Sequence, residues 1–122
     1  DEGKGLGVDA VAFQMKQEGG DVVVVRSNGG AQAGHGVERP DGSRHVFHHV
    51  GAGALAGALT HLSRFFVAHP MVLEEEIAAL HGLGQDELKI TIDPRALVTT
   101  PWDMAINQAL ELVRAKGRHQ SG

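Results

Sequence analysis

The chain has 122 residues, 42% of them hydrophobic and 21% charged, and it carries a formal net charge of −4. This length suits one small domain, and the composition is that of a folded globular chain. The acidic balance argues against nucleic-acid binding through phosphate neutralisation. The chain contains no cysteine, which excludes disulfides and thiolate metal sites and fits a reducing compartment. Because no apolar run approaches the length of a membrane span, no membrane partner is expected.

The first elements indicate an α/β fold. Residues 6–18 are predicted to form a helix, because apolar side chains recur there at helical spacing and Gly19 and Gly20 follow. Residues 21–26 read Asp-Val-Val-Val-Val-Arg, a β-branched run that is typical of a buried strand. A helix followed by a buried strand is characteristic of α/β sheets.

The middle of the chain is predicted to begin with a β-hairpin over residues 37–50. The sequence Pro-Asp-Gly at 40–42 supplies the turn, and residues 44–48 supply the return strand. Residues 51–57 are predicted as a loop and residues 65–67 as a short strand.

A second helix is predicted over residues 71–81, with an apolar stripe that includes Leu80. The block of three glutamates at 74–76 on this helix is predicted to be a solvated face, since runs of like charge usually are. Residues 88–92 alternate between apolar and polar side chains and are predicted to form a strand.

The last element is predicted to be a helix that starts after Thr100. Thr100 suits the N-cap, Pro101 the first helical position and Asp103 the third. The apolar face of this helix is predicted to belong to the core. That face contains Trp102, Ala105, Ile106, Ala109, Leu110 and Val113.

Two glycine-rich segments carry the candidate chemistry, and the first is Asp-Glu-Gly-Lys-Gly at residues 1–5. Backbone N–H groups, the N-terminus of the following helix and Lys4 could together hold phosphates. Asp1 could bind Mg²⁺ or take a proton from a bound ligand. On composition alone, an exposed charged turn is an equally good interpretation.

The second segment, residues 28–36, follows the predicted strand and ends in Ala-Gly-His-Gly. Ligands of α/β folds bind beyond the carboxyl ends of the strands, and His35 there could donate to a phosphate or act as an acid. A surface histidine without a function is the alternative. The chain begins inside the first segment with no strand before it, whereas phosphate loops normally lie between a strand and a helix. Further residues are therefore expected upstream.

The two segments, in this order and separated by a helix and a strand, resemble the adenylosuccinate synthetase family. That family carries Trp-Gly-Asp-Glu-Gly-Lys-Gly, then a strand ending in Val-Val-Arg, then Gly-Gly-x-Asn-Ala-Gly-His-Thr. The matching residues here are 1–5, 24–26 and 29–35. A weaker likeness continues through residues 46–53 and 101–105.

The resemblance implies a phosphate-loop-type mixed α/β sheet with flanking helices. It makes residues 1–122 the N-terminal part of a nucleotide-binding catalytic domain, whose first strand and C-terminal portion lie outside this chain. The chain alone would then not be expected to turn over.

The resemblance also implies a GTP-dependent ligase of purine (AMP) biosynthesis. Such an enzyme joins IMP to L-aspartate through a 6-phosphoryl-IMP intermediate, uses Mg²⁺, and is a cytoplasmic homodimer. Asp1 matches the base that deprotonates purine N1 and, with the carbonyl of Gly34, the Mg²⁺ ligands. His35 matches the acid that stabilises the transferring phosphoryl group. The residues that match GTP and IMP contacts are Asp1, Glu2, Gly3, Lys4, Gly5, Gln32, Ala33, Gly34, His35 and Gly36.

Two site residues depart from the family pattern, since Gln32 replaces an Asn that contacts IMP and Gly36 replaces a Thr. Two alternatives therefore stay open. One is a purine-nucleotide-binding protein without ligase activity, and the other is a related ligase for a different purine monophosphate or amine.

The neighbouring His45, His48 and His49 invite a metal hypothesis, but no Cys or carboxylate spacing supports a zinc site. Alternation along a partly exposed strand is the preferred interpretation of these histidines.

Overall fold

The computed structural model of the protein describes residues 2–27, 34–38 and 42–116. Its helices are α1 (Glu2–Gln17), α2 (Pro70–Gly82), α3 (Pro101–Lys116) and the short 3-10 helix η1 (Ala52–Ala56). Its strands are β1 (Val23–Arg26), β2 (His35–Glu38), β3 (Arg44–Phe47), β4 (Leu59–Leu62), β5 (Val67–Ala68), β6 (Ile90–Ile92) and β7 (Leu97–Val98).

A parallel sheet in the order β1-β4-β6 forms the centre of the molecule. The pairing register places Val24 beside Thr60 and Thr60 beside Ile90. Two smaller pairs accompany this sheet, the antiparallel hairpin β2–β3 and the parallel pair β5–β7. Parallel strands joined through helices confirm the predicted α/β class, and the antiparallel pair makes the strand arrangement mixed.

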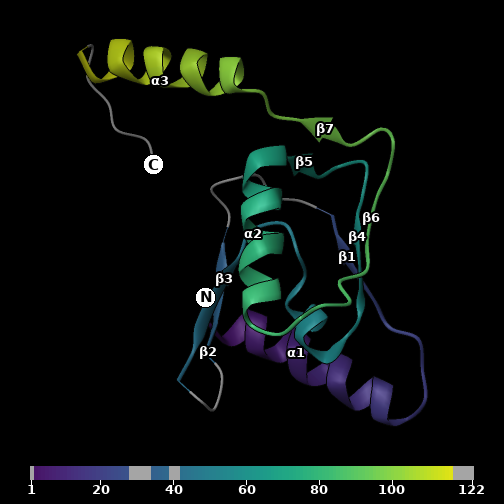
Figure 1. Cartoon of the computed structure of the whole chain (residues 1–122). Helices are drawn as coiled ribbons and strands as arrows, with labels where there is room; N and C mark the ends of the chain where they lie inside the picture. The colour runs from purple at the N-terminus through teal and green to yellow at the C-terminus, as the bar shows by residue number, and fades with distance from the viewer. Residues whose placement is uncertain (1, 28–33, 39–41, 117–122) are drawn as a thin grey trace.

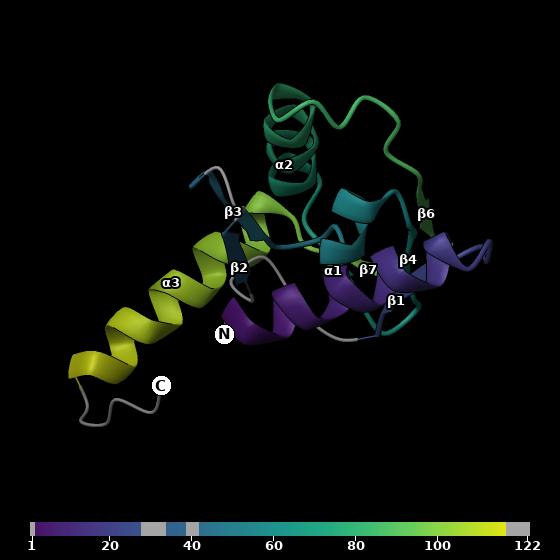
Figure 2. The ribbon, with the colours of Figure 1, turned by 90° about the horizontal axis from the view of Figure 1, so that it is seen from below.

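Only one face of the central sheet is covered within the described residues. Helices α1 and α2, η1 and the hairpin all lie on the same side of the sheet (Figures 1 and 2). On that side Thr60 and Leu62 are fully buried, whereas Val23 and Val25, which alternate to the other side, are 52% and 57% exposed. The prediction of a buried strand at 21–26 is therefore correct for one face of β1 and wrong for the other.

Small residues allow α1 and η1 to approach the sheet closely. A Cβ atom at Gly53 would lie 2.7 Å from Cγ2 of Val24 and 3.0 Å from Cβ of Ala12. A Cβ atom at Gly51 would lie 2.6 Å from Cγ1 of Val24. Because real Cβ atoms do not approach other atoms this closely, glycine at both positions lets η1 fit between α1 and β1.

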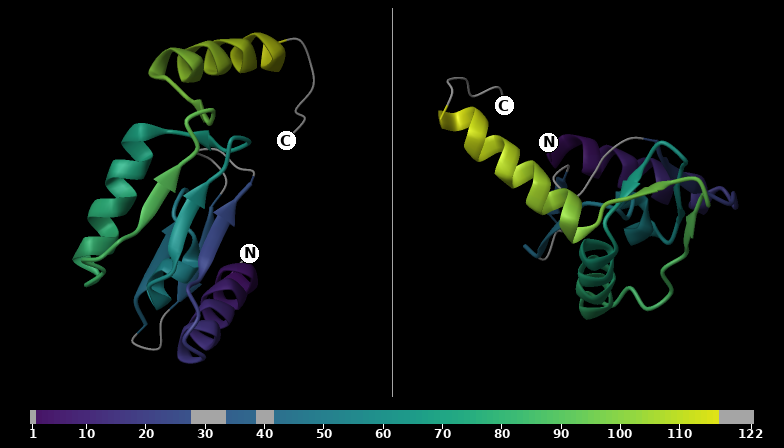
Figure 3. Two further views of the ribbon diagram at one scale, coloured as in Figure 1. Left: turned by 90° about the vertical axis from the view of Figure 1, so that its right-hand side faces the viewer. Right: turned by 90° about the horizontal axis from the view of Figure 1, so that it is seen from above.

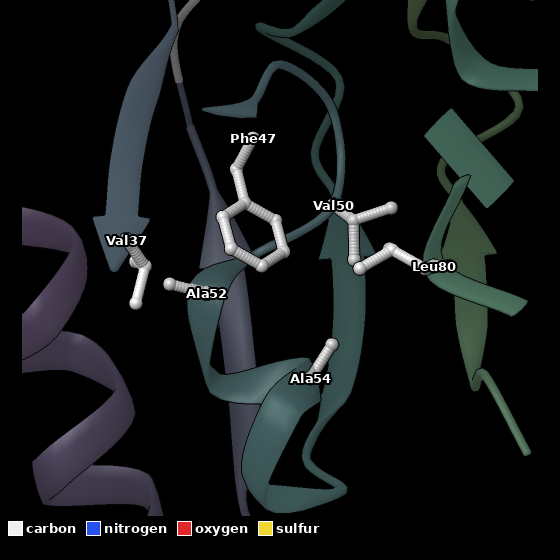
Figure 4. Packing of buried hydrophobic residues seen from close by; sticks show 6 residues of the cluster. All are labelled: Val37, Phe47, Val50, Ala52, Ala54 and Leu80. Atoms are coloured by element: carbon white, nitrogen blue, oxygen red, sulfur yellow. The ribbon is translucent and has the colours of Figure 1, made fainter. Parts of the chain in front are cut away.

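The main hydrophobic core lies between the hairpin, η1 and α2 (Figure 4). Its buried members are Val37, Phe47, Val50, Ala52, Ala54 and Leu80. A smaller cluster of Leu62, Phe66 and Ala68 continues it toward β5. The main core includes Val37 of β2, and the smaller cluster reaches the segment that follows β3 through the contact of Phe66 with His49.

Most element positions follow the sequence prediction, with three corrections in the first half. Helix α1 begins at Glu2, not residue 6, because glycines weaken a helix without terminating it. The centre of the sheet, β4, was not predicted at all. Its sequence Leu-Thr-His-Leu is short and half polar, and it becomes a strand because β1 and β6 pair with it on both sides. In addition, the predicted loop at 51–57 contains η1.

Helix α3 contradicts the prediction that its apolar face belongs to the core. Every residue from 101 to 114 is exposed, and Trp102 and Val113 retain 77% and 69% of their accessible surface. The helix extends away from the body of the molecule (Figure 1). An amphipathic pattern shows that a helix has an apolar face, but not that these 122 residues contain its partner. Within the described part of the chain, no helix combines the length and the apolar character needed to cross a membrane.

Candidate functional site

The structure describes seven of the ten candidate site residues. Asp1, Gln32 and Ala33 lie outside the described residues. The backbone of residues 2–5 forms the first turn of α1, so the predicted glycine loop is the start of a helix. The first N–H groups of a helix have no partner within it, so these residues still present donors suited to an anion.

The described parts of the two predicted segments, residues 2–5 and 34–36, lie at one end of the sheet. Helix α1 runs antiparallel to β1, so its N-terminal end lies toward the end of β1 that carries Arg26 (Figure 3). Helix α1 also packs against β2, which begins with His35. A helix N-terminus and a histidine are therefore brought toward the carboxyl end of β1, where α/β folds bind their ligands.

His35 is the first residue of β2 and is held from two directions. Its ring stacks on Phe47, with centroids 6.0 Å apart and planes inclined by 23°. The Nη1 atom of Arg26 lies 3.3 Å from its Nδ1 and 3.2 Å from its Nε2. Burial lowers the pKa of His35, the charges of Arg26 and His48 lower it further, and Glu76 partly opposes them.

Gly34, immediately before His35, needs to be glycine. A Cβ atom there would lie 2.9 Å from Cγ1 of Val46 and 3.0 Å from Cε1 of His48. The residue is nevertheless exposed. Gly36 is buried inside β2, opposite Val46. The change from the family's Thr to glycine at position 36 thus falls at a position buried in the hairpin.

Glu76 is the main residue that the sequence prediction missed. It was predicted on a solvated face, but it is only 4% exposed and faces the segment that follows β3. Its Oε1 accepts from the backbone N–H groups of His48 at 3.0 Å and Val50 at 3.2 Å, and its Oε2 accepts from His49 N–H at 2.7 Å. The available signal was its spacing, since Glu76 precedes the buried Leu80 by one helical turn and shares its face.

The carboxylate of Glu76 stays ionised to low pH. Burial raises its pKa, but the polar contacts of the His45 and His49 side chains and the backbone N–H groups of His49 and His48 outweigh burial and hold the pKa at about 2. The ring nitrogens of His45 and His49 lie 3.9 Å and 3.7 Å from the carboxylate, beyond hydrogen-bond distance. The three backbone donors are therefore the main support of the charge.

The histidines near Glu76 form a polar cluster. His49 is fully buried, and its Nε2 accepts from the backbone N–H of His69 at 2.8 Å. His69 in turn caps α2, because its Nδ1 accepts from Val72 N–H at 3.3 Å. Among the described residues, no group of three His, Cys, Asp or Glu side chains could hold a metal ion. His45 and His49 instead both face Glu76.

The donors at this end of the sheet suit a phosphate-bearing ligand. The N-terminus of α1 offers N–H groups, and His35 and Arg26 offer further donors. The carbonyl of the exposed Gly34 is a hard oxygen, the class of ligand that Mg²⁺ accepts. Asp1, the other candidate ligand, lies outside the described residues.

Comparison with known proteins gives one consistent family. The family model described as adenylosuccinate synthetase matches residues 1–122. The chain is 33% identical over 123 aligned positions to adenylosuccinate synthetase of Saccharopolyspora erythraea, covering 100% of the chain and 27% of that relative. It is 34% identical over 112 positions to the Mycobacterium tuberculosis protein of that name, covering 91% of the chain and 24% of the relative.

A solved structure gives the same result. The fully ligated adenylosuccinate synthetase of Plasmodium falciparum superimposes with a TM-score of 0.77 at 27% identity, over 96% of this chain and 26% of that one. The chain spans about a quarter of the length of the curated relatives it matches. Because the family model covers every residue, the chain belongs to the adenylosuccinate synthetase family.

Proposed function

We propose that the protein is a GTP-dependent ligase of purine biosynthesis, which joins IMP to L-aspartate to form adenylosuccinate, with residues 1–122 as the N-terminal part of its nucleotide-binding catalytic domain. The observation that carries this proposal is the family match, which includes both glycine-rich segments. The arrangement of α1, Arg26 and His35 at the carboxyl end of β1 supports it, because this is where phosphates would bind.

In the proposed first step, the carboxylate of Asp1 takes the proton from purine N1. The electron pair of that bond makes O6 a nucleophile, and O6 attacks the γ-phosphorus of GTP while GDP leaves. In the second step the amine of L-aspartate attacks C6 and inorganic phosphate leaves with the O6 oxygen. The amine loses its proton to solvent, so that atoms and charges balance.

The remaining candidate residues position and neutralise phosphates. Residues 2–5 supply helix N-terminal donors and the charge of Lys4, and His35 donates an N–H to the transferring phosphoryl group. The nucleotide contacts are proposed to continue through residues 32–36. Bound by the Asp1 carboxylate and the Gly34 carbonyl, Mg²⁺ would neutralise phosphate charge. The family resemblance further supports a cytoplasmic homodimer.

One observation keeps a second function in view. Gln32 replaces the Asn that contacts IMP in the family pattern, and its side chain is one methylene longer. A ligase for another purine monophosphate or amine, or a nucleotide-binding protein without ligase activity, would also retain the phosphate-binding residues.

The test measures GDP and adenylosuccinate formed by the complete gene product with GTP, Mg²⁺, IMP and L-aspartate, omitting each component in turn. We expect product only in the full mixture, and an Asp1→Asn variant that loses at least about 10³-fold in kcat, because the purine stays protonated. Asp86→Asn, at an exposed position away from β1, is the matched control and should retain full activity.

Each other outcome assigns a different function. Turnover of GTP with another purine monophosphate or amine would establish the related ligase. GTP binding without turnover in any mixture would contradict the ligase proposal and leave a binding protein. Full activity of Asp1→Asn would remove Asp1 from the role of base.

A further inference from the structure

Arg26 connects the candidate acid His35 to the segment after β3 that Glu76 holds through three backbone N–H groups. It is the last residue of β1 and is half-buried. Its Nη1 atom lies 3.2–3.3 Å from the two ring nitrogens of His35, and its Nη2 atom donates to the carbonyl of His48 at 2.8 Å. One guanidinium thus bridges the start of β2 and the segment that follows β3.

The guanidinium is itself fixed in place. Its Cζ atom lies 5.7 Å from the ring centroid of the fully buried Phe66, which provides a cation–π contact. The carbonyl of His48 that accepts from it belongs to a segment whose three successive N–H groups donate to Glu76. A continuous set of contacts therefore runs from the buried carboxylate on α2 to the ring of His35.

The contact with Arg26 also restricts the hydrogen bonds that His35 can make. A guanidinium only donates, so the ring nitrogen that it binds must be an acceptor. A neutral imidazole has one acceptor nitrogen and one N–H. Because Nη1 lies at nearly the same distance from both ring nitrogens, the contact fixes the ring edge that carries them but does not select which nitrogen holds the N–H.

We propose that Arg26 is a positioning residue, which holds the ring of His35 in the orientation from which it acts on the transferring phosphoryl group. This inference rests on the proposed function, in which His35 stabilises that group. Arg26 acts through His35 and need not touch a substrate. A small error in the position of a catalytic group can cost a large factor in rate, so an arginine behind the site can determine kcat.

The experiment compares Arg26→Gln and Arg26→Lys in the complete gene product, with Arg64→Gln as the matched control. Arg64 also lies over a phenylalanine, 4.5 Å from the ring centroid of Phe65, but it is exposed. We expect Arg26→Gln to lower kcat on the order of 10–100-fold with KM for GTP and IMP nearly unchanged. Lysine keeps the charge but lacks the planar pair of nitrogens that contacts His35 and the His48 carbonyl, so Arg26→Lys should restore only part of kcat. Arg64→Gln should match the wild type.

A double variant separates positioning from a general structural role. If Arg26 acts through His35, Arg26→Gln should lower kcat no further in a His35→Ala background. An equal additional loss in that background would overturn the proposal, as would a wild-type kcat in Arg26→Gln. Should Arg26→Gln fail to fold, the same cycle is run with Arg26→Lys, and the same outcomes decide.

The ¹⁵N resonances of the His35 ring, recorded at one fixed pH, provide a readout that needs no activity. We expect the same ring ¹⁵N shifts in the wild type and in Arg64→Gln, and changed shifts in Arg26→Gln, which loses the contact with both ring nitrogens. If no mixture of substrates gives turnover, the proposed function fails, but these spectra still decide whether Arg26 holds the ring. Unchanged ring shifts in Arg26→Gln would overturn the inference even in an active enzyme.

Discussion

Helices α2 and α3 are similar in length and each begins with proline, yet α2 packs into the core and α3 does not. Helix α2 inserts a carboxylate between three backbone N–H groups and buries Leu80 in the core. Helix α3 has the clearer local signals, an apolar face and a reciprocal cap in which Thr100 N–H and Asp103 N–H each donate to the other's side chain, at 2.8 Å and 3.3 Å. All its described side chains are nevertheless exposed.

The difference shows that a helix can have clear local sequence signals without packing against the rest of the described molecule. The cap of α3 determines where the helix starts and acts within four residues of chain. The Glu76 contacts determine where the segment after β3 lies, and they join residues 26 to 28 positions apart in sequence. Substitutions at the Glu76 contacts should therefore lower stability more, and over a wider part of the fold, than substitutions at the cap of α3.

The largest effect on the free energy of unfolding is expected from Glu76→Ala. The change leaves three backbone N–H groups without their acceptor, two of them in fully buried residues, and should cost about 3–5 kcal/mol of unfolding free energy. Urea denaturation of the complete gene product measures it. Glu75→Ala, at an exposed position on the same helix, is the control and should change little. Equal costs for the two variants would show that the buried contacts do not stabilise this region.

The acid sensitivity of the fold should depend on the same carboxylate. The pKa of Glu76 is about 2 in the folded protein against an ordinary value of 4.5. A lowered folded pKa stabilises the protein above the ordinary pKa, and this contribution is lost as pH falls from about 4.5 toward 2, on the order of 2–3 kcal/mol in total.

Thermal unfolding between pH 5 and 3 tests this expectation. The wild type should lose more stability over that range than Glu76→Gln, whose amide does not titrate. Parallel pH curves for the two proteins would mean that other groups account for acid unfolding.

A smaller effect is expected where α1 and η1 meet the sheet. Gly53→Ala adds a Cβ 2.7 Å from Val24 and 3.0 Å from Ala12, and overpacking of this kind should cost about 1–3 kcal/mol. Gly82→Ala is the matched control, because nothing lies within 4 Å of its added Cβ and it is the last residue of α2. If both substitutions were neutral in urea denaturation, α1 would have room to move away from η1.

The sequence predicted the elements whose signals are local and missed those that depend on distant partners. The hairpin, α2 and α3 were predicted close to their observed positions because turn residues, helical spacing and a cap indicate them directly. Strand β4 carries no such signal, since Leu-Thr-His-Leu gains its place only from its neighbours β1 and β6.

The same distinction applies to the candidate site. The glycine-rich segments and His35 were found as motifs, while the roles of Arg26 and Glu76 depend on contacts across the fold. Arg26 was noted only as part of a strand, and Glu76 only as part of a charged run. The sequence around Arg26 or Glu76 does not indicate what either side chain contacts, because the contacted residues lie on other elements.

The smallest and most local effect is expected from Thr100→Ala, which removes the side-chain acceptor for Asp103 N–H. Loss of an N-cap threonine destabilises a helix by about 1 kcal/mol. Because α3 buries none of its described side chains, this loss should speed hydrogen exchange in α3 while leaving exchange in α2 and the urea midpoint of the body unchanged. Gln108→Ala, at an exposed position inside α3, is the control and should slow exchange slightly, since alanine favours helix. Faster exchange in α2 as well would show that α3 unfolds together with the body, and the contrast between the two helices would then describe their packing but not their stability.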